Sequence, residues 1–464
     1  MSVKPLGIKD LPPALPLRKL VGPSFIILGL GLGSGELILW PYLSSHYGLG
    51  IIWGAVLGIT FQFFMNMEIE RYALVHGESV FVGFARKLKW LPLWFLLSTF
   101  LPWIWPGIVA SSAKLLGTLG GVENTSNLSI IFLIVMGLIL TIGPVLYKTV
   151  ENLQKILISV GVPSVFILSI ILARQEHWAA LTSGIFGKGD GYFLLPVGLP
   201  IASFLAALAY AGAGGNLNLA QSYYVKEKGY GMGKYAGRIT SLLTGKVESM
   251  SLSGSKFEPT PANVAVFRQW WKNVNIEHFL VFWLTGSITI LLLALLAYVT
   301  TFGTGQTTGD INFMLAEADQ ISSRLFPFAG TFFLLVAGLT LFGTQLTVFD
   351  ATSRILSENL ILAFPSRLTE QKLPKIYYIV LWVQILFGVG IFLSGFTQPL
   401  QLLTTAAVLN AFAMFVHVGL TLWMNKTMLD TAVRPSRFRT VAMLSAFLFY
   451  GGFSLYVLLD IFMK

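Results

Sequence analysis

The sequence has no cysteine, which excludes disulfide bonds, thiolate metal ligands and cysteine nucleophiles. It also has little charge, because Lys, Arg, Asp and Glu make up 11% of the 464 residues, whereas an average soluble protein carries about 25%. Hydrophobic residues make up 55%, which is more apolar surface than one globular core can hide. These properties exclude an ordinary soluble fold and predict a polytopic membrane protein.

Long apolar runs divide the chain into eleven predicted membrane spans and leave no room for a second soluble domain. The runs are too long and too uninterrupted for barrel strands, which would alternate over about ten residues. We therefore predict an all-α integral membrane protein. The spans are expected at residues 20–44, 48–75, 91–119, 128–147, 152–173, 194–226, 277–302, 328–360, 375–395, 398–425 and 437–463.

The positive charges gather in alternate loops, which predicts the orientation of the chain. Basic residues concentrate in the tail 1–19, around Arg86 and Lys87, and in the loop 226–272. The positive-inside rule then predicts a cytoplasmic N-terminus and an external C-terminus. We expect the membrane to be a bacterial inner membrane. It also accounts for the formal net charge of +10 without any nucleic-acid partner.

Two spans carry clusters of glycine where a membrane helix would lie at bilayer depth: GLGLGSGE at residues 29–36 and YAGAGGN at residues 210–216. Each glycine costs about 1 kcal/mol relative to alanine in a helix interior. We therefore expect both helices to break there and to line a polar cavity, as broken helices do at the midplane sites of secondary transporters. The alternative is that the glycines only form small-residue packing faces.

The two predicted breaks open the first and sixth spans, five helices apart. Because five is odd, two five-helix halves must run oppositely through the membrane, which predicts a five-plus-five inverted repeat with one extra span. The expected divisions are a cytoplasmic tail (1–19), a first repeat (20–175), an external loop (176–193), a second repeat (194–425), and a cytoplasmic loop with the eleventh helix (426–464).

Motifs for other chemistry are absent from the sequence. It has no Walker A motif, the glycine run has no βαβ context, and neither a nucleophile elbow nor an HExxH zinc motif occurs. We therefore expect no cofactor and no enzymatic activity. Gradient-driven or facilitated transport is favoured over pumping by ATP hydrolysis.

On these spans and motifs the sequence resembles the Nramp family of divalent-metal transporters, which have the LeuT-type fold. Gly22-Pro23 matches the Gly-Pro that precedes the family's Asp-Pro-Gly-Asn motif, and that motif falls on residues 33–36. Asn216-Leu217-Asn218-Leu219 looks like the segment after the family's Met-Pro-His, which falls on residues 213–215. The resemblance covers nearly the whole chain and is strongest to the divergent Nramp-related branch that includes magnesium transporters.

The resemblance implies a changed substrate, because the family's metal ligands are replaced. Gly33 stands for its Asp, Glu36 for its Asn, and Ala213 for its Met. Carboxylate, carbonyl and water ligands suit a hard cation such as Mg²⁺ better than manganese or iron. The third span also lacks the acidic residues of proton-coupled members, so proton coupling by the family's route is not expected.

The predicted metal ligands are the carboxylate of Glu36 and the backbone carbonyls of Gly33 and Ala211. An intramembrane carboxylate indicates function, although Glu36 is alternatively a partner for the free amides of its half-helix. The full predicted substrate site consists of Gly33, Ser34, Gly35, Glu36, Tyr210, Ala211, Ala213, Gly214, Asn216 and Asn410.

A cytoplasmic gate is predicted from Gln345, Asp350 and Arg354 in the eighth span, because Asp350 and Arg354 are spaced to pair at i, i+4. The alternative is a solvated helix end. The five histidines show no metal-ligand spacing and receive no role.

The predicted partners are the lipid bilayer and an ion or small-molecule substrate. The leading prediction is an alternating-access transporter of a hard or hydrated divalent cation. The alternative is a carrier of a small organic solute such as an amino acid, whose carboxylate would bind the free amides of the half-helices. The coupling ion, transport direction and oligomeric state stay open.

Overall fold

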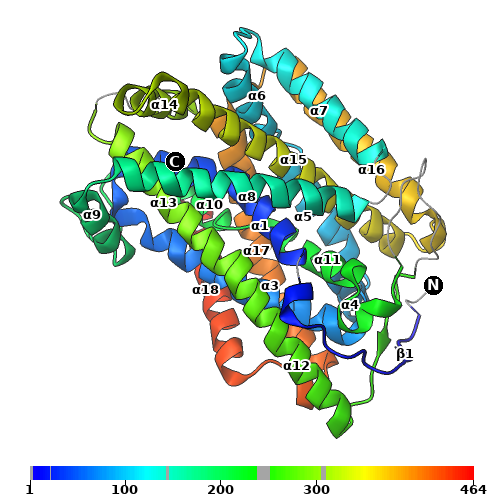
Figure 1. Cartoon of the computed structure of the whole chain (residues 1–464). Coiled ribbons are helices and arrows are strands. Elements are labelled where there is room, and N and C mark those ends of the chain that lie inside the picture. Colours follow the sequence, from blue (N-terminus) through cyan, green and yellow to red (C-terminus); the bar gives the residue numbers. More distant parts are fainter. Residues whose placement is uncertain (1–3, 21, 143–145, 238–250, 305–309, 464) are drawn as a thin grey trace.

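The computed structural model describes residues 4–20, 22–142, 146–237, 251–304 and 310–463. Helices dominate this part of the chain, and they pack into one bundle (Figure 1). The first half contains α1 (Pro23–Gly31), η2 (Leu32–Leu39), α2 (Trp40–Tyr47), α3 (Trp53–His76), α4 (Val80–Lys87), α5 (Leu91–Trp103), α6 (Gly107–Leu119), α7 (Thr125–Ile142), α8 (Leu146–Leu172) and α9 (Gln175–Ile185). The second half contains α10 (Ile201–Ala209), η4 (Gly215–Ala220), α11 (Gln221–Lys228), η5 (Gly231–Tyr235), α12 (Pro261–His278), η6 (Phe279–Leu284), α13 (Thr285–Thr301), α14 (Asn312–Arg324), α15 (Pro327–Ala363), α16 (Leu373–Leu393), α17 (Pro399–Met428) and α18 (Arg437–Met463).

Ten helical units of the described chain are long and apolar enough to cross a membrane. They correspond to ten of the eleven predicted spans, and the end of the predicted fourth span, at 143–145, lies outside the described residues. The predicted sixth span is not among the ten because it is divided into α10, η4 and α11. The all-α membrane fold is thus confirmed.

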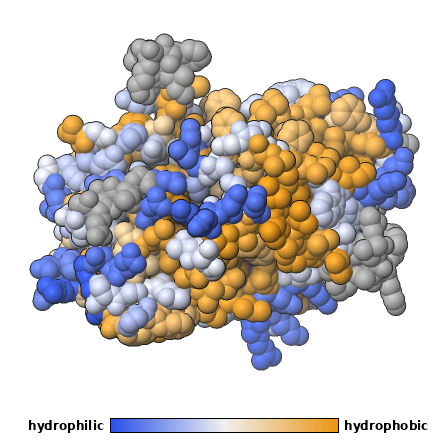
Figure 2. Space-filling model, turned by 90° about the horizontal axis from the view of Figure 1, so that it is seen from above, coloured by the Kyte–Doolittle hydropathy of each residue, from blue (hydrophilic) through white to orange (hydrophobic). Residues whose placement is uncertain are grey.

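Burial separates central helices from peripheral ones. In the first span, Pro23–Tyr47, 94% of the most apolar window is buried, whereas the value is 28% for Thr125–Ile142 and 22% for Lys148–Leu172. The peripheral helices expose large apolar side chains, and Figure 2 shows a broad apolar area with hydrophilic residues mainly toward the edges of that face. Such a surface suits contact with lipid. The first span, in contrast, is surrounded by other parts of the protein.

The first span does not unwind, so the prediction of a break in it is wrong. The chain stays helical through α1, η2 and α2, and η2 is a π-helical stretch in the middle of the span. Gly31 and Leu32 both have right-handed helical dihedral angles. A π segment keeps the backbone hydrogen-bonded while changing the direction of side chains, and such segments often occur at functional sites.

The sixth span does break, as predicted. α10 ends at Ala209, and regular helix resumes only at Gly215, in the short 3₁₀ segment η4 that leads into α11. Gly212, Gly214 and Gly215 have φ values of 131°, 76° and 55°. These angles lie outside the right-handed helical region, and glycine adopts them without the penalty of a Cβ atom.

Two further spans, and the start of the sixth, differ from their predicted form. The third is divided into α5 and α6, and the seventh belongs to a helical unit of 41 residues, Pro261–Thr301. The sixth begins at Ile201 instead of residue 194, and the predicted external loop 176–193 contains most of α9. In the tail, the short strand β1 (Gly7–Ile8) pairs in parallel with β2 (Ser255–Lys256).

Candidate functional site

The glycines of the first span let it approach the broken segment of the sixth. A Cβ atom added at Gly35 would lie 1.6 Å from the backbone oxygen of Tyr210, and one at Gly31 would lie 2.7 Å from the backbone of Gly212. Any side chain would therefore separate the two segments. The predicted contact between these spans is confirmed, and close packing accounts for Gly31 and Gly35.

Gln62 on α3 bonds the backbone groups that the break leaves without helical partners. Its Nε2 donates to the Ala209 carbonyl at 3.0 Å, and its Oε1 accepts from the Gly214 amide at 3.2 Å. The Oε1 also accepts from Asn218 Nδ2, which donates to Asn66 as well. One buried glutamine thus bridges the two ends of the break.

Helix α17 supports the other side of the break. Asn410 Nδ2 donates to the Tyr210 hydroxyl at 2.9 Å, and His417 Nε2 lies 3.0 Å from the Gly215 carbonyl. Trp103 stacks on the Tyr210 ring with centroids 5.6 Å apart. The predicted neighbours Tyr210 and Asn410 are therefore in direct contact.

Asn216 bonds to the third span through its amide nitrogen. Its Nδ2 donates to Ser98 Oγ and Thr99 Oγ1 on α5, both at 2.9 Å. Among the described residues its Oδ1 has no hydrogen-bond partner. Asn216 connects the sixth span to the third.

Glu36 lies in the π-helical stretch and is fully buried. Its Oε1 is 3.4 Å from the position that a Cβ atom would take at Gly286 on α13, and Ile59 of α3 also borders that position. Among the described residues, neither carboxylate oxygen has a hydrogen-bond partner, and the same holds for Ser34 Oγ. The glutamate therefore does not cap its own helix, in contrast to the alternative considered for it.

The structure thus assembles the predicted site only in part. Gly35, Tyr210 and Asn410 lie together, whereas Glu36 borders α13 and Asn216 points to α5. Within the described ranges, no group of three or more His, Asp or Glu side chains is arranged to hold a metal ion. Metal binding would consequently depend on Glu36 together with backbone or water oxygens.

Sequence reasoning missed Gln62 and His417. Gln62 and Asn66 are polar residues at i, i+4 in an otherwise apolar span, which was a usable signal for a polar helix face. His417 carried no such signal, because its partner is a backbone carbonyl distant in sequence.

The predicted gate pair forms, and it belongs to a larger buried ionic cluster. Arg354 Nε lies 2.9 Å from both carboxylate oxygens of Asp350, and its guanidinium also pairs with Glu227 of α11. Tyr377 of α16 donates to Asp350 at 2.9 Å. Because all these side chains are buried, the pair is not a solvated helix end. Gln345 is buried on the same helix and does not enter the Asp350–Arg354 pair.

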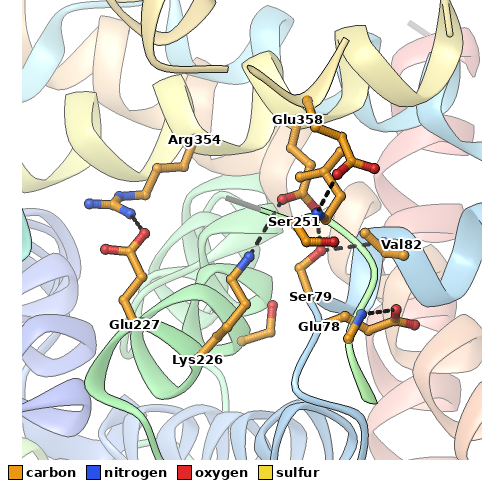
Figure 3. Close-up of polar contacts among 12 residues, drawn as sticks. Glu78, Ser79, Val82, Lys226, Glu227, Ser251, Arg354 and Glu358 are labelled. Carbon is orange, nitrogen blue, oxygen red and sulfur yellow. Dashed lines mark hydrogen bonds and ion pairs between the residues drawn. The ribbon is translucent and has the colours of Figure 1, made fainter. Parts of the chain in front are cut away.

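The cluster continues to the loop before α4, as Figure 3 shows. Lys226 of α11 lies 4.0 Å from Glu358 of α15, which also accepts a hydrogen bond from Ser79. Glu78 beside it pairs with Arg86 at 2.8 Å. Ion pairs therefore link α11 with α15, and the Ser79 hydrogen bond joins them to the α3–α4 connection at one end of the bundle.

Comparison with known proteins gives matches in structure alone. No family model and no curated protein matches the sequence. A crystal structure of the manganese transporter of Eremococcus coleocola, a mutant, matches with a TM-score of 0.69 over 97% of this chain and 89% of that chain, at 13% identity. The chain has the LeuT-type fold.

Two further solved structures with this fold are similar to the chain. Mhp1, a nucleobase-cation-symport-1 family transporter in a closed conformation with bromovinylhydantoin bound, matches with a TM-score of 0.57 at 13% identity and covers 98% and 96% of the two chains. MhsT in complex with L-phenylalanine matches with a TM-score of 0.53 at 14% identity over 94% and 97%. These proteins have different ligands, so the structural likeness establishes the fold and does not identify the substrate.

Proposed function

We propose that the chain is a secondary transporter that works by alternating access and moves a hard or hydrated divalent cation such as Mg²⁺. The observation that carries this proposal is Glu36: a fully buried carboxylate without a hydrogen-bond partner in the described chain, on the helix that packs against the broken span. A bare carboxylate in such surroundings is costly. A bound cation compensates its charge, and intramembrane carboxylates mark ion pathways in transport proteins.

The available ligands favour a hard cation. The Gly33 carbonyl lies inside the continuous π-helical stretch, where the helix uses it, so it drops out of the predicted set. The Glu36 carboxylate, the backbone oxygen of Ala211 in the break and water remain, and such oxygen ligands suit Mg²⁺. The sequence has no cysteine, and Ala213 provides no thioether at the position that the Nramp resemblance gives to methionine. Iron and the later transition metals, which prefer imidazole or sulfur ligands, gain less from a site of oxygen atoms alone.

The bonding of the break weighs against a carrier of amino acids. An amino-acid carboxylate would need free backbone amides at the half-helices, and Gln62 already bonds one amide of the break, that of Gly214. The structural likeness to MhsT supports the transporter class and does not determine the substrate of this chain.

The buried ionic cluster of Asp350, Arg354, Glu227, Lys226 and Glu358 acts in this proposal as the gate at the end of the bundle that the positive-inside rule places in the cytoplasm. Opening that end would separate α11 from α15 and would break these pairs. Removing one partner of a buried ion pair costs about 3 to 5 kcal/mol. We therefore expect Arg354→Gln to favour the open state.

The gate is testable by thiol labelling, because the chain has no native cysteine. Ser222 is buried beside the cluster on α11. Labelling of a Ser222→Cys protein by a membrane-impermeant reagent should accelerate when Arg354→Gln is added. An unchanged labelling rate would show that the cluster is structural.

Uptake by purified protein in liposomes tests the substrate. We expect Mg²⁺ uptake that Glu36→Gln abolishes while the protein stays folded and monodisperse, because glutamine keeps the size of the side chain and loses the charge. Glu317→Gln is the matched control, since Glu317 on α14 is also buried and its Oε1 has no hydrogen-bond partner in the described chain. That variant should transport normally.

Mn²⁺, Ca²⁺ and a panel of amino acids complete the experiment. Uptake of an amino acid, with no uptake of any cation, would replace the proposal by the organic-solute alternative. Undiminished Mg²⁺ uptake by Glu36→Gln would remove Glu36 from the binding site.

A further inference from the structure

A second buried polar cluster connects the start of the first span with the seventh. Ser24 Oγ on α1 lies 2.5 Å from Glu277 Oε2 and 2.7 Å from His278 Nδ1, at the end of α12. All three side chains are buried. A single hydroxyl group thus bridges a carboxyl group and an imidazole that lie about 250 residues further along the chain.

The aromatic surroundings hold the imidazole in place. His278 stacks on Phe282 with centroids 4.7 Å apart and an interplanar angle of 7°, and on Phe63 at 5.6 Å. The seventh span then turns π-helical at Phe279–Leu284, directly after this cluster. The histidine therefore has few orientations available other than the one that faces Ser24.

Two polar atoms at the ends of the cluster lack hydrogen-bond partners. Among the described residues, neither Glu277 Oε1 nor His278 Nε2 has a hydrogen-bond partner. Buried polar atoms in folded proteins are almost always bonded. These two atoms, an acceptor at one end and a ring nitrogen at the other, are the positions where a proton can enter or leave the cluster.

We propose that Ser24, Glu277 and His278 form a proton-carrying site that couples transport to a proton gradient. In one state Glu277 is a carboxylate and His278 an imidazolium: Ser24 donates to Oε2 and accepts from Nδ1–H. When Ser24 passes its proton to Oε2 and receives the one from Nδ1, Glu277 becomes a neutral acid and His278 a neutral ring. The total charge is unchanged, and the proton has crossed from the seventh span's imidazole to its carboxyl group.

The seventh span connects this site to the proposed substrate site. Phe282, which stacks on His278, reaches the break: its Cζ lies 2.9 Å from the position of a Cβ atom at Gly212. Further along the same helix, Gly286 lies against Glu36. A change of hydrogen bonding at His278 can therefore move a ring that touches the broken span. The inference rests on the proposed transport function.

The charged and titratable neighbours are known for each packing element. Glu70 of α3 and Lys228 of α11 act electrostatically on Glu277, and Arg439 of α18 acts on His278. Tyr230, ahead of η5, faces Glu277 and Glu70. Charges of both signs surround the cluster, and each of them affects its titration. The titration is therefore compared with that of variants of Ser24 and Glu277 themselves.

Nitrogen NMR of the full-length protein with labelled histidine tests the site without transport. We expect the His278 ring signals to respond to pH, because its Nε2 has no hydrogen-bond partner among the described residues and can take up a proton. Glu277→Gln and Ser24→Ala should each alter that pH dependence, and Ser24→Thr, which keeps the hydroxyl, should restore it. His278 signals that do not respond to pH, or that respond identically in all variants, would overturn the proposal.

Mg²⁺ uptake into liposomes tests the coupling. A pH gradient of about one unit is a tenfold difference in proton activity, so we expect it to change the initial uptake rate of the natural protein by up to about tenfold. The change should disappear in Glu277→Gln, while uptake without a gradient persists. The matched control is Ser45→Ala. Ser45 Oγ also contacts a histidine, His46 Nδ1 at 2.9 Å, but this pair has no part in the proposal.

The two failures are distinguishable. Absence of Mg²⁺ uptake in the natural protein, with a titration of His278 that depends on Glu277, would refute the Mg²⁺ proposal and support the proton site. Mg²⁺ uptake that ignores the pH gradient would refute the coupling and leave the transport function standing.

Discussion

The two glycine-rich stretches have similar compositions and opposite backbones. In the first span the chain remains helical through residues 29–36, with Gly31 at φ −78° and ψ −41°. In the sixth span Gly212, Gly214 and Gly215 all have positive φ, and the helix is interrupted. Glycine therefore does two different jobs in these stretches: it permits a left-handed backbone in one and close contact in the other.

The stretches depend on each other. The first span can stay helical and still lie against the break only because Gly31 and Gly35 have no side chains. The break can persist only because Gln62, Asn410 and His417 bond its backbone or support it. The continuous first span and the hydrogen-bonded break of the sixth span therefore form one structural unit. Substitutions in each span should separate the two roles of glycine.

The largest expected effect is at Gly35. A Cβ atom there would lie 1.6 Å from a backbone oxygen of the sixth span, so Gly35→Ala must move the two spans apart. We expect a loss of at least about 3 kcal/mol in the free energy of unfolding, measured by denaturant unfolding in detergent. The control is Gly390→Ala on α16, where nothing lies within 4 Å. Equal stability of the two variants would contradict the close-contact role.

The next effect is expected at Gln62. Gln62→Leu would leave the Ala209 carbonyl and the Gly214 amide buried without their partner. Each such group costs about 1 to 3 kcal/mol, so we expect a loss of about 3 kcal/mol in the same assay. Gln269→Leu, at an exposed position of α12, should change stability little. A Gln62 variant as stable as this control would mean that the break has other partners.

The smallest effect is expected at Gly214. Gly214→Ala combines a φ of 76° with a Cβ atom 2.5 Å from the Tyr210 ring, and we expect a loss of about 2 kcal/mol. Gly121→Ala shares the positive φ, 65°, but has nothing within 4 Å. It should therefore lose only about 1 kcal/mol. If the two losses are equal, backbone conformation alone decides the role of Gly214.

The spans were predictable because hydropathy is a local property of the sequence. Each residue contributes to membrane partitioning almost independently, so long apolar runs such as 328–360 identify helices without any tertiary information. The pairing of Asp350 with Arg354 was predictable for a similar reason, since i, i+4 spacing fixes their proximity on a helix.

The detailed site was not predictable in the same way. The same glycine signal was interpreted as a break in both spans, but only the sixth span breaks. Glu36 was expected to face the break, and its carboxylate borders Gly286 of the seventh span. Its direction depends on the π-helical stretch of η2, which alters the usual helical spacing and has no clear sequence signature.

The sequence alone therefore determined that the chain is an all-α membrane protein with two glycine-rich spans, because composition and hydropathy act locally. Tertiary structure decided which of those spans breaks and which groups bond it. Gln62 reaches the Ala209 carbonyl across 147 residues, and Ser24 reaches Glu277 across 253. Such contacts are absent from any local pattern, because they exist only once distant helices have packed and a buried polar group has no water to bond.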